Sequence, residues 1–343
     1  MGAIGVLSKL MVARMPETLV SAIYTGRREK MGNFVLDPKA QAVGQLANAL
    51  RTMEEDPDVG EAREQMRKLV KAFDEPYPPL QQVENIQVGG AEGMLDARLY
   101  SDHSPADGPQ PTLVYYHGGG WVQGDLDTHD GICGKLAKWS GIQVIAVDYR
   151  LAPEARFPAA PKDAIASFNW IIENAGDLNV DPARTGIGGD SAGGNLSAVV
   201  CQQNAASGAP APAYQVLIYP GCDASEDSAS MAGMPDAYIL PRERMDWYIN
   251  TYLGDHEDRT DPLLSPGLTE DLGNQPKAYV VTCGFDPLRD EGDAYAEKLK
   301  SAGVPTVLDQ YHGQIHAFIS LTKVIPQGNI CIRKMADWIK SAC

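Results

Sequence analysis

The stretch Gly188–Asn195, which reads Gly-Gly-Asp-Ser-Ala-Gly-Gly-Asn, constrains the fold more than any other part of the chain. It follows a short strand-like run and opens a helix-like run, so it predicts that Ser191 lies on a sharp strand-to-helix turn. Glycines on both sides have a steric reason, because bulky neighbours would clash in so tight a turn. The helix start would supply unpaired N–H groups and a positive dipole end where an oxyanion could form. The stretch therefore predicts an exposed, nucleophilic serine.

A serine is a poor nucleophile near neutral pH unless a base takes its proton and a third group orients that base. The chain has six histidines. His316 follows the last strand candidate, 306–310, and precedes the final helical region, which is the position expected of the base. His312 lies four residues earlier and is the natural alternative.

The candidate for the acid is Asp286, which comes just after the strand candidate 278–283. Catalytic groups of open α/β sheets gather at the C-terminal ends of strands. Asp290 and Glu291 follow one helical turn later, and we interpret them as solvated or capping carboxylates. The order Ser191, Asp286, His316 is the serine–acid–histidine order of one family of hydrolase folds.

A second glycine-rich segment, with the sequence His-Gly-Gly-Gly-Trp from His117, follows directly after a predicted strand. Consecutive glycines let backbone N–H groups turn toward a ligand without interference from side chains. We predict an oxyanion hole made by the N–H of Ala192 and by two N–H groups among Gly118, Gly119 and Gly120. Gly119 is the safest of the three, and His117 is interpreted as structural.

Strand candidates alternate with helical periodicity from residue 81 onward, which indicates an α/β protein with a mostly parallel central sheet flanked by helices. Residues 1–80 differ, because their apolar positions recur at helical spacing (Val43, Leu46, Leu50 and Met53 in one run). We predict a helical cap segment over 1–80 and a catalytic domain over 81–343. Residues 223–273 are long for a plain connection and predict a second cap insertion, with a helix packed on the sheet as the alternative.

The net charge excludes some classes of binding partner, and the cysteines indicate the cellular compartment. The formal net charge of −16 argues against nucleic acid and against an anionic membrane surface. No apolar run reaches the ~18 residues needed to span a bilayer. The six cysteines are scattered without metal-ligand spacing, which favours free thiols in a reducing compartment. The N-terminal residues 1–14 do not have the charge order of a secretion signal, so we expect a cytoplasmic protein. Because no cluster of metal-ligating residues occurs in the sequence, we also expect no metal.

Five segments together resemble the bacterial hormone-sensitive-lipase family of esterases. They are His-Gly-Gly-Gly-Trp at 117–121, Asp-Tyr-Arg-Leu-Ala-Pro-Glu at 148–154, Phe-Pro-Ala-Ala at 157–160, Gly-Asp-Ser-Ala-Gly-Gly-Asn at 189–195 and Asp-Pro-Leu-Arg-Asp at 286–290. The resemblance runs from about residue 83 to the C-terminus, and Asp190 matches the branch of the family with Asp before the serine. Two departures are a long segment before Asp37 and Ala317 where glycine is frequent.

The resemblance implies an α/β-hydrolase fold with an N-terminal helical cap and a serine carboxylesterase that cleaves small-molecule esters of short or medium acyl chains without a cofactor. It also implies that a homodimer is common. Trp121, Asp190 and Tyr219 are candidates for the substrate pocket, and Phe34 is a weaker one. The alternatives are an amidase or carbamate hydrolase on the same triad and a small-molecule receptor of this fold. The receptor is disfavoured because all three triad residues are present.

Overall fold

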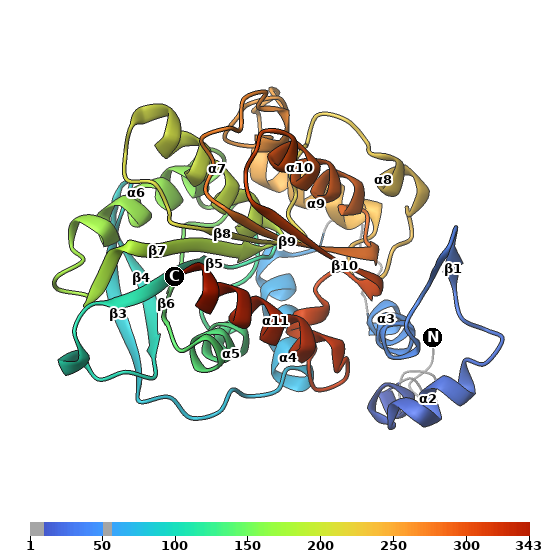
Figure 1. The fold of residues 1–343 in the computed structure, drawn as a ribbon. Coiled ribbons are helices and arrows are strands. Elements are labelled where there is room, and N and C mark those ends of the chain that lie inside the picture. Colours follow the sequence, from blue (N-terminus) through green and yellow to red (C-terminus); the bar gives the residue numbers. More distant parts are fainter. Residues whose placement is uncertain (1–9, 51–56) are drawn as a thin grey trace.

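The computed structural model describes residues 10–50 and 57–343. Its core is an eight-stranded sheet with the strand order β10-β9-β8-β7-β5-β6-β4-β3 (Figure 1). Every pair from β10 to β6 is parallel, and the two pairs at the other edge, β6 with β4 and β4 with β3, are antiparallel. The predicted α/β-hydrolase fold with a mostly parallel sheet is therefore confirmed. The strands are β3 (Gln82–Gly90), β4 (Gly93–Ser101), β5 (Gln110–Tyr116), β6 (Gln143–Val147), β7 (Val180–Asp190), β8 (Gln215–Ile218), β9 (Ala278–Phe285) and β10 (Thr306–Ile315).

Helices cover both faces of the sheet (Figure 1). Because side chains alternate along a strand, Leu113 and Tyr115 of β5 join one apolar cluster while Val114 and Tyr116 join the other. The first cluster includes α5 (Asp130–Ser140) and α11 (Gln327–Ala342). The second includes α6 (Ala159–Glu173) and α7 (Ala192–Ser207), and α10 (Arg289–Ser301) packs beside α7 in a third cluster. Strands β6, β8 and β9 are buried along their whole length, as expected for a sheet covered on both faces.

In the described part of the N-terminal segment, helices alternate with a short hairpin, and residues 10–14 are also helical. The helices are α2 (Glu17–Ile23), α3 (Pro38–Leu50) and α4 (Val59–Phe73), and the hairpin pairs β1 (Lys30–Met31) with β2 (Phe34–Val35). The sequence predicted only helices here. Met53, the last residue of the predicted apolar run, lies outside the described residues, as do residues 1–9 of the N-terminal segment 1–14.

Arg63 holds helix α4 to the part of the chain that carries the sheet. Its guanidinium donates hydrogen bonds to the carbonyl oxygens of Val122 and Ala152 at 2.8 and 2.9 Å, and it pairs with Glu154 at 2.7 Å. Beyond the end of α4, Asp74 accepts a hydrogen bond of 2.6 Å from Lys135, a lysine that is only 1% exposed. These contacts join α4 to the segment that follows the glycine triplet.

The segment between β8 and β9 contains α8 (Ala229–Gly233), α9 (Arg242–Leu253) and the short 3₁₀ helix η2 (Pro266–Leu268). From α9, Trp247, Tyr252 and Leu253 are buried in the cluster that also contains Trp121. Trp121 and Tyr252 stack with their ring centroids 4.5 Å apart. Aromatic packing thus fixes α9 against the end of the glycine-rich segment.

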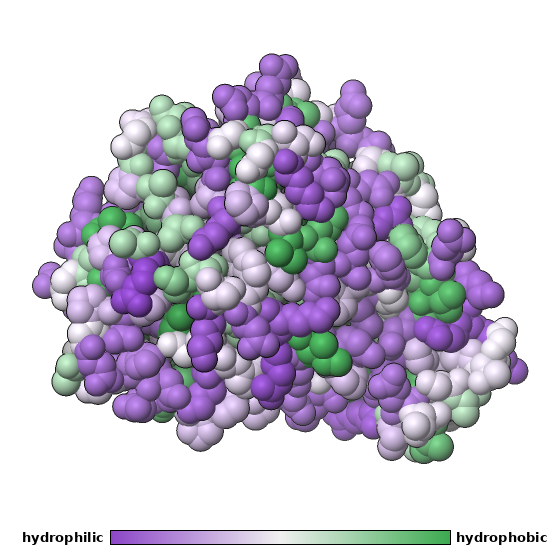
Figure 2. Space-filling view, in the orientation of Figure 1, coloured by the Kyte–Doolittle hydropathy of each residue, from purple (hydrophilic) through white to green (hydrophobic). Residues whose placement is uncertain are grey.

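Hydrophilic side chains dominate the face of the molecule seen in Figure 2, and apolar side chains occur there in small separate groups. Among the described residues, no helix is long and apolar enough to cross a membrane.

Candidate active site

The turn that carries Ser191 joins the last residue of β7 to the first residue of α7. Ser191 has a φ of +54°, a backbone conformation that residues other than glycine rarely adopt. The flanking glycines are needed for space, because a Cβ on Gly189 or Gly193 would overlap the carbonyl oxygen of Tyr116. The turn therefore packs directly onto the end of β5.

His316 and Asp286 lie beside this serine. His316 Nε2 is 3.0 Å from Ser191 Oγ, and His316 Nδ1 is 2.7 Å from Asp286 Oδ2. The other carboxylate oxygen of Asp286 accepts the N–H of Leu288 at 2.9 Å, which orients the carboxylate. Asp286 is fully buried and His316 is 5% exposed. The structure thus brings together the three residues that the sequence predicts as a triad.

The alternative residues from the sequence lie elsewhere. His312 is exposed and stacks on Phe34 of β2 with the ring centroids 4.6 Å apart. Asp290 accepts the N–H of Ser230 at 2.7 Å and pairs with Arg289. Glu291 is buried rather than solvated, and its Oε2 accepts the N–H groups of both Cys222 and Asp223 at 2.7 Å. Burial raises the pKa of Glu291 to about 8.

The glycine segment that follows β5 turns near the start of α7. Gly119 and Gly120 have φ values of +118° and +61°, and Ala192 is the first residue of α7. The Gly118 N–H donates a hydrogen bond of 3.0 Å to Asp190 Oδ1, so this N–H is already engaged. Of the three glycines predicted for an oxyanion hole, the geometry therefore favours Gly119 and Gly120 as donors together with Ala192.

Behind the serine turn, Asp190 forms a buried ion pair with His129 at 3.2 Å and accepts the Tyr115 hydroxyl at 2.8 Å. Burial alone would raise the pKa of Asp190, but the charge and hydrogen bond of His129 lower it below its ordinary value. Conversely, burial alone would lower the pKa of His129, and Asp190 raises it. Sequence reasoning missed His129, since nothing local to it indicates a partner in the serine turn.

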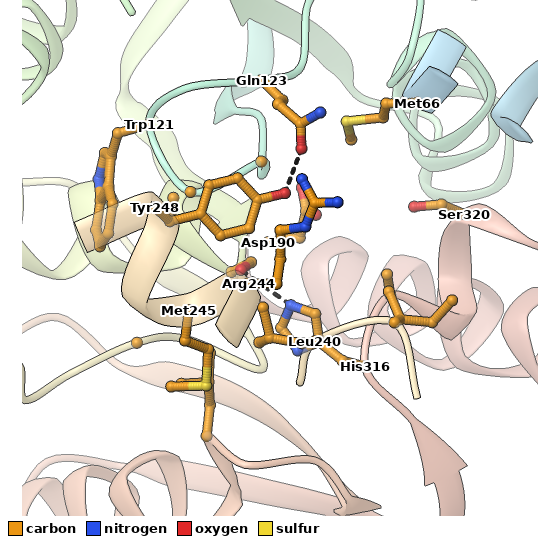
Figure 3. A pocket seen from close by; sticks show the side chains of 18 of the residues that line it. Met66, Trp121, Gln123, Asp190, Leu240, Arg244, Met245, Tyr248, His316 and Ser320 are labelled. Carbon is orange, nitrogen blue, oxygen red and sulfur yellow. Dashed lines mark hydrogen bonds between the residues drawn. The ribbon is translucent and has the colours of Figure 1, made fainter. Parts of the chain in front are cut away.

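A cavity of about 640 Å³ opens over Ser191 and His316 (Figure 3). Its walls come from the catalytic domain, from α4 and from α9, and they include Met66, Leu69, Phe73, Trp121, Gln123, Leu240, Arg244, Met245 and Tyr248. Of the predicted pocket residues, Trp121 and Asp190 line the cavity. Tyr219 does not line it and instead packs on the ring of His316, with centroids 4.6 Å apart. Among the described residues, no cluster of three metal-ligating side chains occurs.

A model of proteins with the alpha/beta hydrolase fold matches residues 113–320, more than half of the sequence. The chain belongs to the alpha/beta hydrolase fold family. Several of its relatives within this family are named esterases or carboxylesterases, and the resemblance to bacterial hormone-sensitive-lipase esterases is confirmed. The carboxylic ester hydrolase LipN of Mycobacterium tuberculosis is 38% identical over 316 residues, which cover 90% of this chain and 83% of that protein.

Solved structures give the same result. An ester hydrolase from the metagenome of Lake Arreo, in complex with a bipyridine phosphonate derivative, has a TM-score of 0.86 and 40% identity to this alpha/beta hydrolase. That match covers 89% of this chain and 98% of the other. The hyperthermophilic esterase of the archaeon Pyrobaculum calidifontis has a TM-score of 0.82 and 39% identity, and the match covers 88% and 96% of the two chains.

Proposed function

We propose that the protein is a serine carboxylesterase that hydrolyses short- to medium-chain carboxylic esters through Ser191, His316 and Asp286. The observation that carries this proposal is the continuous hydrogen-bonded chain from Ser191 Oγ through the His316 ring to the buried Asp286. The esterase relatives support it independently.

In the first half of the reaction, His316 Nε2 takes the Ser191 proton as Oγ attacks the ester carbonyl carbon. Asp286 orients the ring through Nδ1 and stabilises the imidazolium that forms. The N–H groups of Gly119, Gly120 and Ala192 receive the oxyanion. The C–O bond to the alcohol then breaks, and His316 returns the proton to the leaving alkoxide.

In the second half, a water molecule gives a proton to His316 Nε2 and attacks the acyl carbon. A second tetrahedral oxyanion forms at the same N–H groups. It collapses to release the carboxylic acid, and the proton goes back to Ser191 Oγ.

We further propose that the N-terminal helical segment and the 223–273 insertion act as a two-part cap that shapes the substrate cavity. Support comes from the lining residues, because Met66, Leu69 and Phe73 of α4 and Met245 and Tyr248 of α9 all face this cavity. A series of p-nitrophenyl esters from acetate to palmitate tests the chain-length assignment. We expect activity to be highest at short or medium chains, and a maximum at palmitate would contradict it.

The test of the nucleophile is Ser191→Ala assayed with p-nitrophenyl butyrate. We expect hydrolysis to fall to the level of the oxyanion hole and binding alone, ~10³-fold or more below the native enzyme. Circular dichroism serves as the control for folding. Retention of substantial activity in a folded variant would overturn the assignment.

A cytoplasmic location and a homodimer complete the proposal. All six cysteines are free thiols, which fits a reducing compartment. The homodimer rests on the resemblance alone. Cell fractionation and light scattering coupled to size-exclusion chromatography test these two statements.

A further inference from the structure

Arg244 is a half-buried cation in the wall of the substrate cavity. It projects from α9, and Figure 3 shows its guanidinium among the side chains that point into the cavity. Within the described part of the chain, no carboxylate lies within ion-pair distance of it, and its close contact is the ring of Trp247, 5.0 Å from the guanidinium carbon. A guanidinium in a cavity wall without an anion is an available binding group for one.

The neighbouring Arg242 shows the contrast. It also belongs to α9 and to the cavity wall, but its guanidinium binds Asp227 and Asp246. Arg242 is thus neutralised by two carboxylates, whereas no described residue does the same for Arg244.

The side-chain amide of Gln123 is a second hydrogen-bond donor near Arg244, and Tyr248 connects the two residues. Tyr248 follows Arg244 by one helical turn, so these two side chains share one face of α9. The Tyr248 hydroxyl donates to Gln123 Oε1, which leaves the Gln123 amide NH₂ group as a donor at the cavity wall (Figure 3). The Tyr248 ring packs so closely against Gly120 that a Cβ on this glycine would overlap the ring. Tyr248 therefore lies next to the predicted oxyanion hole, with Gln123 hydrogen-bonded to it and Arg244 one helical turn away on α9.

Among the described residues, six carboxylates line the cavity, and four of them carry little uncompensated negative charge. Asp190 is paired with His129, and Asp227 and Asp246 are paired with Arg242. Burial raises the pKa of Glu291 to about 8, so this group is mostly uncharged at neutral pH. Asp223 is half-buried and accepts hydrogen bonds from Ser225, and Glu226 is exposed to solvent.

We propose that the cavity holds an anion subsite, formed by Arg244 and Gln123, that binds a carboxylate carried by the ester substrate. The substrate class is thus an ester with a free carboxylate, either a monoester of a dicarboxylic acid or an acyl ester of a hydroxy acid. The guanidinium binds the carboxylate by charge-assisted hydrogen bonds, and the Gln123 amide adds a neutral one. This inference rests on the proposed esterase activity and adds a substrate preference to it.

The experiment compares two pairs of substrates that differ only in charge. Monoethyl glutarate and ethyl glutaramate place the carboxylate or its neutral amide on the acyl side, and 4-acetoxybenzoate and 4-acetoxybenzamide place it on the alcohol side. We expect the native enzyme to prefer the carboxylate in one pair by about tenfold in kcat/KM, and the pair that shows the preference locates the subsite. Raising the ionic strength should reduce this preference, since the subsite is partly open to solvent.

Three variants test the residues. Arg244→Gln should remove the preference, and Arg244→Lys should keep part of it because the charge remains. Arg333→Gln is the matched control and should leave the preference unchanged, because Arg333 also packs on a tryptophan ring, that of Trp139, but does not line the cavity. Equal kcat/KM values within both pairs, or a preference that survives in Arg244→Gln, would overturn the subsite.

Neutral p-nitrophenyl butyrate separates the two proposals. Arg244→Gln should hydrolyse it at close to the native rate, whereas failure of the native enzyme on this ester would count against the esterase activity itself. Loss of butyrate hydrolysis in a folded Arg244→Gln variant would show a general role in catalysis and would also overturn the subsite.

Discussion

The carboxylate of Asp190 accepts the backbone N–H of Gly118 at 3.0 Å and thereby joins the serine turn to the glycine segment after β5. The same oxygen, Oδ1, also faces Nε2 of His129 at 3.2 Å. One buried side chain thus fixes the relative position of the nucleophile and of the predicted oxyanion donors. Asp190 is in this view a positioning residue that does not itself touch the reacting atoms.

Two replacements of Asp190 separate its hydrogen bonds from its charge. Asp190→Asn keeps an oxygen that can accept from the Gly118 N–H and the Tyr115 hydroxyl but removes the charge that faces His129, while Asp190→Ala removes all three contacts. We expect kcat on p-nitrophenyl butyrate to fall in both variants and about tenfold further for alanine, because the buried hydrogen bonds to Gly118 and Tyr115 are lost in addition. The surface variant Asp181→Asn is the control and should leave kcat unchanged. Equal losses for asparagine and alanine would contradict a positioning role of the hydrogen bonds to Gly118 and Tyr115.

The base assignment is tested by two histidine variants. His316→Asn should lower kcat by ~10⁴-fold or more, since Ser191 then has no group to take its proton. His312→Asn should retain nearly full kcat, because His312 is exposed and contacts Phe34 rather than the serine. Steady-state kinetics with p-nitrophenyl butyrate measure both. Inactivation by the His312 variant alone would make the assignment wrong.

The buried carboxyl of Glu291 should make the stability of the folded protein depend on pH. Burial raises its pKa in the folded state to about 8, well above the ordinary value of 4.5. The folded state therefore binds more protons than the unfolded state between these values, and this contribution to stability is lost as the pH rises toward and through 8. Glu291→Gln mimics the protonated form, so its melting temperature should fall less than that of the native protein between pH 6 and about 9. If the melting temperatures of the native protein and of Glu291→Gln change equally with pH over this range, the pKa of Glu291 is not raised.

Removing one partner of the buried pair Lys135–Asp74 should lower the stability of the protein strongly. Lys135 donates to Asp74 at 2.6 Å and to Thr322 at 2.7 Å. Asp74→Ala leaves a buried ammonium without its counter-charge, which should lower the free energy of unfolding by about 3–5 kcal/mol. Glu297→Ala breaks the exposed pair with Lys300 and should cost less than about 1 kcal/mol in the same urea titration. Similar costs for the two variants would disprove this ranking.

The sequence predicted the sheet because its buried strands are short apolar runs that alternate with helical periodicity. It did not predict the β1–β2 hairpin, although Gly32-Asn33 between the two strands is a turn signal and Gly32 has a φ of +57°. The two-residue strands of this hairpin are too short to show a periodicity. Helix α5 was also missed, although Ile132, Leu136 and Ala137 recur at helical spacing and Gly141 follows its C-terminal end.

The triad residues could be predicted because each follows a strand end in a fixed chain order. The supporting contacts could not, since they join residues far apart in sequence. His129 lies 61 residues before Asp190, and only the folded chain shows that it pairs with that carboxylate. The same contact network engages Gly118, a choice among three glycines that the sequence left open. Arg244 likewise became noticeable only once the structure described its surroundings.

The positive φ of Ser191 puts activity and stability in opposition at a single position. A residue with a side chain in such a conformation costs about 1–3 kcal/mol, and glycine adopts it with little penalty. The residue that would best stabilise this turn is therefore one that has no hydroxyl to attack an ester. Searches for more thermostable variants that do not assay activity would tend to select the loss of the serine, because the strain at the turn and the reactivity of the enzyme have the same structural origin.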